Sequence, residues 1–227
     1  MEFLQTTEFW IGLLKIIWIN IILSGDNAVV IALAARGLPP LQQRKAVLFG
    51  SGAAVVLRIA LTVVAVKLLT MPYLQSVGGV LLLYIGVQLL SDQGEGEGEE
   101  KTHGTLLAAR RTILIADLVM SLDNVIGVAA AAKGSMLLLV LGLAISIPMV
   151  VFGSTMMIRL MERFPVVVTL GAALIGWVGG ETMANDTILA TLMQDLPWLH
   201  QAGPVLGAAL VLGLGRWLQK RGQTAAN

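Results

Sequence analysis

The chain has 227 residues, of which 56% are hydrophobic and 13% charged, and its mean hydropathy is +0.83. A soluble domain of this size averages roughly 25% charged residues, so the composition excludes an ordinary soluble protein. The net charge of +1 gives no indication of nucleic-acid binding, and because the chain has no cysteine, disulfides and thiolate metal sites are excluded.

Apolar runs long enough to span a bilayer recur along the whole chain. A spanning helix needs about 20 mainly apolar residues. The sequence predicts seven such helices, at about residues 9–35, 45–69, 73–90, 107–132, 136–158, 166–182 and 204–219. Segments such as VLLLYIGVQLL (80–90) do not alternate apolar and polar residues as barrel strands do. We therefore expect an all-α polytopic membrane protein.

Basic residues in the predicted connections indicate how the helices are oriented. Lys and Arg concentrate on the cytoplasmic side of membrane proteins. One set of connections and the C-terminal end hold Arg36, Arg44, Lys45, Lys101, Arg110, Arg111, Arg159, Arg163, Arg216, Lys220 and Arg221. The connections on the opposite side hold only Lys67 and Lys133. We therefore expect the N-terminus outside and the C-terminus in the cytoplasm.

Two segments carry the same polar motif and align as copies of a repeat. INIILSGDNAVVIALAARG (19–37) aligns with ADLVMSLDNVIGVAAAAKG (116–134), and MPYLQSVGGVLLLYIGVQLL (71–90) aligns with FPVVVTLGAALIGWVGGETM (164–183). Each copy is three helices long, and since three is odd, the second copy enters the membrane from the opposite side. Inverted repeats are common in secondary transporters, whose sites lie near the midplane at the repeat interface. Chance similarity among apolar helices is the alternative.

The repeat defines the expected organisation of the chain. The expected parts are a first three-helix repeat (8–90), a cytoplasmic linker (91–106), a second, inverted repeat (107–183), an extracytoplasmic loop (184–203) and a seventh helix (204–219). The linker is Gly-rich and acidic. Low hydrophobicity and high charge predict that it is solvated, and a metal-sensing loop is the alternative.

Several polar residues fall inside the predicted helices. A charge at the bilayer centre costs at least about 2.5–3.5 kcal/mol, so Asp26, Asp117 and Asp123 indicate a functional site. Positions i, i+4 and i+7 share one helical face. The residues on these faces are Asn20, Ser24 and Asn27 in the first copy and Asp117, Ser121 and Asn124 in the second. Inverted symmetry can bring the two faces together near the midplane; the alternative is that these groups only hydrogen-bond one helix to another.

These polar groups offer only oxygen ligands. Carboxylate, amide and hydroxyl oxygens suit Mg²⁺, Ca²⁺ and Mn²⁺, whereas zinc and copper sites usually recruit His or Cys. Both histidines, His103 and His200, fall in predicted loops. Gly25 favours a local break in the first helix, which would free backbone carbonyls for the ion. Leu122 replaces that glycine in the second copy, where a break is less favoured.

Arg58 is a further charge near the middle of the second predicted helix. It can serve as a structural counter-ion to one of the aspartates, and it also affects the charge balance. Three carboxylates and one guanidinium leave a net charge of −2, which one dication neutralises. Without metal the site would need about two protons, because buried like charges oppose ionisation. This charge balance leads to the hypothesis of exchange between a divalent cation and protons.

The SGDN and SLDN motifs, the Ala-rich stretches after them and the seven-helix layout resemble the TerC family of bacterial integral membrane proteins, over about residues 8–220. The resemblance implies a minimal family member that exports Mn²⁺ across the bacterial cytoplasmic (inner) membrane. It also implies a link to secretion machinery, which the residues themselves do not show. Metal-handling roles are implied for Asp26, Asn27, Asp117, Asp123 and Asn124.

Other functions stay open at this point. One is a non-transporting membrane scaffold in metal or tellurite resistance. Another is an intramembrane aspartyl protease, in which two aspartates would share a proton. The Gly-x-Gly-Asp sequence expected of such a protease is absent, so we expect no enzyme. The small-residue stretch GSGAA (50–54) suits packing either within the bundle or between two subunits of a homodimer.

Overall fold

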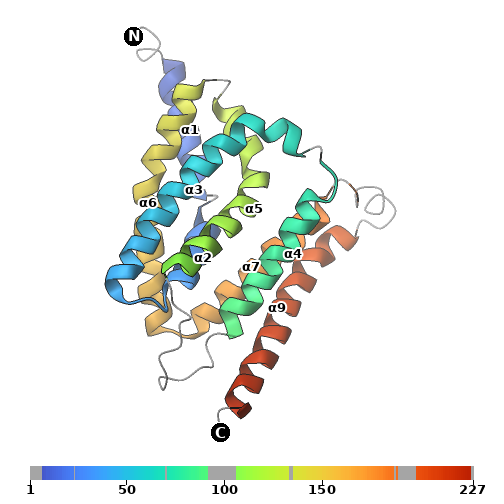
Figure 1. Ribbon diagram of the computed structural model, residues 1–227. Helices are drawn as coiled ribbons and strands as arrows, with labels where there is room; N and C mark the ends of the chain where they lie inside the picture. The colour runs from blue at the N-terminus through green and yellow to red at the C-terminus, as the bar shows by residue number, and fades with distance from the viewer. Residues whose placement is uncertain are drawn as a thin grey trace.

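The computed structural model is entirely helical in the residues that it describes, which are 7–22, 24–69, 71–91, 106–132, 135–186, 188 and 198–225. The helices are α1 (Thr7–Ile22), α2 (Gly25–Ala35), α3 (Pro40–Leu69), α4 (Leu74–Ser91), α5 (Leu106–Ala132), α6 (Met136–Arg163), α7 (Val166–Ala184) and α9 (Trp198–Ala225) (Figure 1). Most of the expected linker (91–106) and much of the expected loop (184–203) lie outside the described residues.

Four of the described helices are each long and apolar enough to cross a membrane. These spans are Pro40–Val64, Leu74–Ser91, Met136–Arg163 and Val166–Ala184. The apolar parts of α1 and α2, Phe9–Ile19 and Gly25–Ala35, are shorter. Four helices that can each cross a membrane agree with a polytopic membrane protein. The full number of seven crossings stays a prediction.

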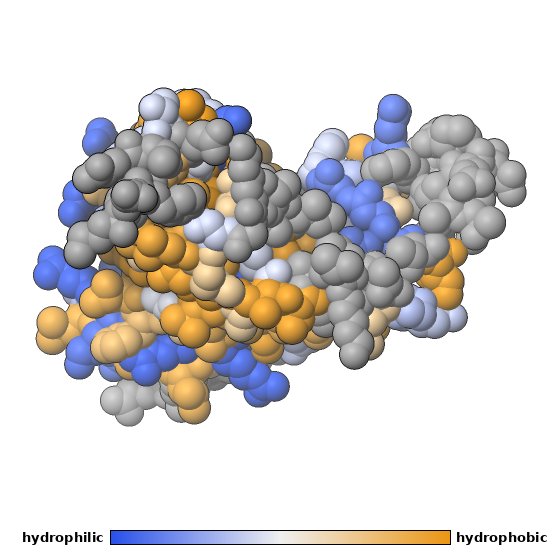
Figure 2. Space-filling model, turned by 90° about the horizontal axis from the view of Figure 1, so that it is seen from above, coloured by the Kyte–Doolittle hydropathy of each residue, from blue (hydrophilic) through white to orange (hydrophobic). Residues whose placement is uncertain are grey.

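The outer surface of the bundle is strongly apolar. Large hydrophobic side chains are exposed on most helices, among them Trp18 (65%), Val56 (68%), Tyr84 (65%), Phe152 (72%) and Leu170 (63%). Figure 2 shows such apolar residues at the surface, beside hydrophilic ones. Extended apolar surface of this kind is rare on soluble monomers, and hydrocarbon is the solvent that suits it.

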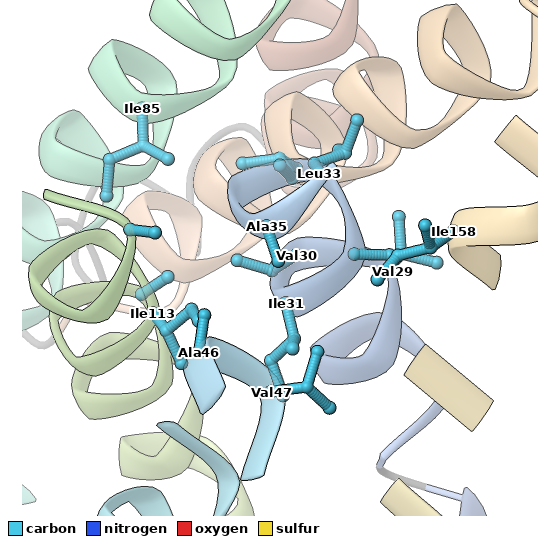
Figure 3. Packing of buried hydrophobic residues seen from close by; sticks show 14 of the residues in the cluster. Val29, Val30, Ile31, Leu33, Ala35, Ala46, Val47, Ile85, Ile113 and Ile158 are labelled. Carbon is cyan, nitrogen blue, oxygen red and sulfur yellow. The ribbon is translucent and has the colours of Figure 1, made fainter. Parts of the chain in front are cut away.

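The helix α2 lies at the centre of the fold and contacts α3, α5, α6 and α7. Its side chains from Asn27 to Leu33 are buried. In the core, Ile31 points toward Val47 of α3 (Figure 3). The small residues Ala28 and Ala32 of α2 are both buried, and small side chains let neighbouring helices approach closely in membranes.

The first predicted span is interrupted at its polar motif. The helix α1 ends at Ile22 and α2 begins at Gly25, where a Cβ would meet no described atom within 4 Å. The glycine is therefore not needed for close packing, and its conformational freedom is consistent with the local break. By contrast, α5 runs without interruption through Leu122 at the equivalent position. Both features agree with the expectation from Gly25 and its replacement by leucine.

A pair of glycine steps lets α7 and α9 cross with their backbones close together. Gly176 and Gly180 lie one turn apart on α7, as do Gly203 and Gly207 on α9. A Cβ on Gly176 would lie 2.6 Å from the carbonyl oxygen of Gly207, and a Cβ on Gly203 would lie 2.9 Å from that of Gly180. Since real Cβ atoms do not approach so closely, only glycine allows this crossing, which is the small-residue packing common in membrane helices.

A carboxylate that follows α7 caps the first turn of α4. Asp186 is buried and accepts hydrogen bonds from the backbone N–H groups of Tyr73 (3.3 Å), Ser76 (2.7 Å) and Ile188 (3.0 Å). The first N–H groups of a helix have no partner within the helix, and a negative charge suits that end of the dipole. Burial raises the pKa of Asp186, but these hydrogen bonds outweigh it and hold the pKa below its ordinary value of 3.8.

The other end of α4 is capped by a positive charge. Arg36, which ends α2, donates a hydrogen bond from Nη2 to the carbonyl oxygen of Leu89 at 3.0 Å. That carbonyl lies in the last turn of α4, where backbone oxygens lack a partner within the helix. The helix α4 is thereby attached at one end to α2 and at the other to the chain that follows α7.

We predict that Asp186→Ala lowers the free energy of unfolding at pH 7 by about 1–2 kcal/mol, the usual cost of losing a cap. Because the folded-state pKa is lowered, this stability is present above 3.8 and is lost as the pH falls through the folded value. The difference in free energy of unfolding is measured by denaturing the wild type and Asp186→Ala in detergent at pH 7 and in steps below pH 4. Glu181→Ala, at an exposed position of α7, is the matched control. A difference that stays constant down to the lowest pH would contradict the capping role.

Candidate functional site

A buried ion pair joins α3 to α5 inside the bundle. Arg58 of α3 is 4% exposed, and its Nη2 donates to Oδ1 of Asp117 at 3.0 Å. Its Nε donates to the hydroxyl of Ser121 at 3.1 Å, and that hydroxyl donates to Oδ2 of Asp117 at 3.3 Å. Both carboxylate oxygens of Asp117 are therefore engaged. A buried charge pair is tolerated when its members also satisfy each other's hydrogen bonds, as they do here.

The break between α1 and α2 brings polar side chains to the N-terminus of α2. Asp26 is partly buried in the first turn, and its Oδ1 accepts a hydrogen bond from the backbone N–H of Asn27 at 2.9 Å. Ser24 and Asn27 are buried. The charges of Arg58 and Asp117 both act on Asp26, so the break and the ion pair share one electrostatic environment. A helix N-terminus also favours a carboxylate.

The remaining predicted residues are placed less completely. Asn124 lies in α5 and is partly buried, within one turn of Ser121. Asp123 also lies in α5, and Asn20 lies in α1, but both side chains are outside the part of the chain that the structure describes. Metal-binding roles for these residues therefore stay predictions.

The described carboxylates do not form a ready-made metal cluster. Within the described ranges, no group of three or more His, Asp and Glu side chains converges on one point. Asp117 is already neutralised by Arg58. The described hydrogen bond of the Asp26 carboxylate is the local one from the backbone N–H of Asn27. The arrangement thus offers one paired and one separate carboxylate, with amide and hydroxyl oxygens beside them.

Sequence reasoning missed several buried polar residues, among them Ser51 of α3, which is 1% exposed. Its hydroxyl has no hydrogen-bond partner among the described residues, and the same is true of the Ser24 hydroxyl. The spacing could have revealed it, because Ser51 precedes Arg58 by seven residues and therefore lies on the same face of α3.

The protein has an apolar exterior, helices long and apolar enough to cross a membrane, and polar residues around a helix break. These features define a helical integral membrane protein. The family described as "Integral membrane protein TerC family" matches residues 5–223. The chain belongs to this family, which confirms the resemblance carried by SGDN and SLDN.

Known relatives agree with this assignment. The chain is 42% identical to the "Uncharacterized membrane protein YjbE" of Bacillus subtilis (strain 168) over 205 residues, which are 90% of this chain and 94% of the relative. It is 28% identical to the "UPF0053 inner membrane protein YoaE" of Escherichia coli (strain K12), covering 82% of this chain but only 39% of that longer protein. A second Bacillus subtilis (strain 168) protein, the "Uncharacterized membrane protein YkoY", is 25% identical over 75% of this chain and 58% of its own length. No solved structure matches the chain.

We predict that Arg58→Met lowers the free energy of unfolding by about 3–5 kcal/mol, because it leaves the Asp117 carboxylate buried without its counter-charge. The double variant Arg58→Met/Asp117→Leu should recover most of this loss, since apolar groups replace both charges. Unfolding of the two variants and of Asp117→Leu in one detergent system completes the double-mutant cycle. Additive losses in the double variant would show that the pair does not couple α3 to α5.

Proposed function

We propose that the protein is a transporter that exports a divalent metal cation, with Mn²⁺ the favoured substrate. The observation that carries this proposal is the partly buried carboxylate of Asp26 at a helix break within an apolar bundle, beside the buried Asn27. Broken helices within membranes are tolerated where they line a cavity or bind an ion, and in transporters they form substrate sites. Carboxylate, amide and backbone oxygens are the ligands of hard divalent cations.

The charge of the site supports a divalent substrate. Because Arg58 neutralises Asp117, the charges left for a substrate are those of Asp26 and Asp123. One dication would balance these two charges. When the cation leaves, the carboxylates need other positive charges, and protons are the simplest source. The proposed mechanism is therefore exchange of one divalent cation for protons, with Arg58 holding the charge of Asp117 constant throughout.

The topology that we propose has seven crossings in two inverted three-helix repeats and a seventh helix. In this arrangement α1 and α2 together form one interrupted crossing. The beginning of α1 and the end of α9 lie at opposite ends of the molecule (Figure 1), as an odd number of crossings requires. The distribution of Lys and Arg favours a cytoplasmic C-terminus. The name of YoaE, an inner membrane protein, supports the same membrane for this chain.

We predict saturable Mn²⁺ flux in proteoliposomes that contain the wild-type protein, with proton movement in the opposite direction reported by an internal pH dye. Asp26→Asn and Asp123→Asn should each reduce this flux at least about tenfold, because each removes one of the two charges that balance the cation. Glu162→Gln, at an exposed position near the end of α6, is the matched control and should leave the flux unchanged.

Three outcomes separate the alternatives. Flux that survives both Asp26→Asn and Asp123→Asn would make the aspartates structural and contradict the proposed site. No wild-type flux in tight, correctly loaded vesicles would favour a membrane scaffold. Competition by Mg²⁺ or Ca²⁺ at equal concentration would show that the site does not select Mn²⁺, since all three accept the same oxygen ligands.

A further inference from the structure

Two buried serine hydroxyls, that of Ser24 just before α2 and that of Ser51 in α3, lack a hydrogen bond of the kind that other described hydroxyl groups make. A hydroxyl in a helix commonly donates a hydrogen bond to a backbone carbonyl one turn earlier. Among the described helical residues, six hydroxyls do so at 2.6–2.9 Å, those of Thr62, Ser91, Ser146, Ser154, Thr155 and Thr182. The hydroxyls of Ser24 and Ser51 are buried and have no partner among the described residues.

Burial makes this difference significant. Ser51 is only 1% exposed, and Ser24 is 7% exposed. A polar group removed from solvent without a hydrogen bond is unfavourable, and native proteins usually satisfy such groups with water or a bound ligand. Because neither hydroxyl is bonded to a backbone carbonyl or to another described group, both are available to a group that is not part of the described protein.

The fold places the two serines around the polar start of α2. The connection between α2 and α3 is short, so α3 turns back beside α2, and Ile31 of α2 packs against Val47 of α3 (Figure 3). One turn back from Ile31 is Asn27, and one turn forward from Val47 is Ser51. Ser51 therefore lies at the level of Asn27, and Ser24 lies a further turn along α2 on the same side.

The same face of α3 continues to the ion pair. Arg58 lies two turns beyond Ser51 and contacts Asp117. Between the core contact at Val47 and the guanidinium, this face therefore offers a hydroxyl that no described group uses, in an otherwise apolar interior. No other side chain on this stretch of α3 could contribute an oxygen ligand.

We propose that Ser51, together with Ser24, lines a water-accessible path to Asp26 and Asn27, and that its hydroxyl oxygen is a ligand of the divalent cation in that path. This inference rests on the proposed transport function and adds a ligand from α3 to those from α2. A hydroxyl oxygen suits a hard cation and carries no charge, so it would help the cation to shed water without holding it strongly.

The absence of cysteine from the chain allows a direct test. Ser51→Cys introduces a single thiol, which should react with a small cationic methanethiosulfonate reagent in the purified protein, at a rate that Mn²⁺ lowers at least about threefold. A thiolate prefers soft metals, so Cd²⁺ should inhibit Mn²⁺ flux through this variant at about tenfold lower concentration than in wild type. Ser154→Cys is the matched control, because Ser154 is also buried in a helix but its hydroxyl is bonded to Val150.

A second pair of variants tests whether the Ser51 hydroxyl contributes to binding of the cation. Ser51→Ala should raise the Mn²⁺ concentration for half-maximal flux about threefold or more, while Ser154→Ala leaves it unchanged. Ser24→Cys provides an independent position on the same path should Ser51→Cys fold poorly, as judged by gel filtration in detergent.

The outcomes distinguish this inference from the proposed function. Flux in wild type, with a Ser51→Cys thiol as unreactive as Ser154→Cys and no gain in Cd²⁺ sensitivity, would overturn the inference and leave the transporter intact. A reactive thiol that Mn²⁺ protects, in a protein without flux, would support the path and the ligand while contradicting transport. A reactive thiol that Mn²⁺ does not protect, with half-maximal flux unchanged in Ser51→Ala, would overturn the role of Ser51 as a ligand.

Discussion

The guanidinium of Arg58 can be buried between α3 and α5 only because oxygen atoms face it there. An isolated charge of this kind would cost several kcal/mol in an apolar bundle, so Asp117 and Ser121 must stay opposite it. The requirement sets both the rotation of α3 about its axis and its position along α5. In that register a Cβ at Gly50 would come within 3.0 Å of Ile113, so the glycine leaves room for the neighbouring helix. Apolar packing and charge pairing therefore select the same arrangement.

The electrostatic consequence reaches the break between α1 and α2. Asp26 experiences both the attraction of Arg58 and the repulsion of Asp117, and these two effects are opposite in sign because the two groups form an ion pair. Under the proposed function, a substrate cation near Asp26 would therefore meet a carboxylate whose two charged neighbours act on it in opposite directions. This suits reversible binding, since a cation held by several unbalanced carboxylates would leave slowly. The residues of α2 that follow the break, Asn27 to Leu33, are buried among the neighbouring helices, which keeps this part of the broken span away from lipid.

The other half of the fold is held by different forces. Glycines bring the backbones of α7 and α9 together, and the Asp186 carboxylate attaches the end of α7 to the start of α4. Arg36 attaches the opposite end of α4 to α2. A motion that separated α4 from α7 would have to break the cap at Asp186, whereas a motion of these helices as one unit would preserve it. The capped helix α4 therefore links the outer helices to the element that carries Asp26.

Much of this protein could be predicted from the sequence. Composition determined the membrane class, the paired SGDN and SLDN motifs determined the family, and Gly25 against Leu122 indicated which copy of the motif would break its helix. These are local properties, because hydropathy and helix propensity depend on neighbouring residues. The partner of Arg58 was not predictable in this way, since three aspartates were available to it.

Only the tertiary structure showed that Asp117 is the partner of Arg58 and that Ser51 is a buried hydroxyl without a described partner. It also showed that Asp186 caps the start of α4. The physical reason is that such contacts depend on how each helix is rotated and shifted against another. The residue pattern within one helix specifies which of its faces is polar. It does not specify which face of another helix will pack against that polar face.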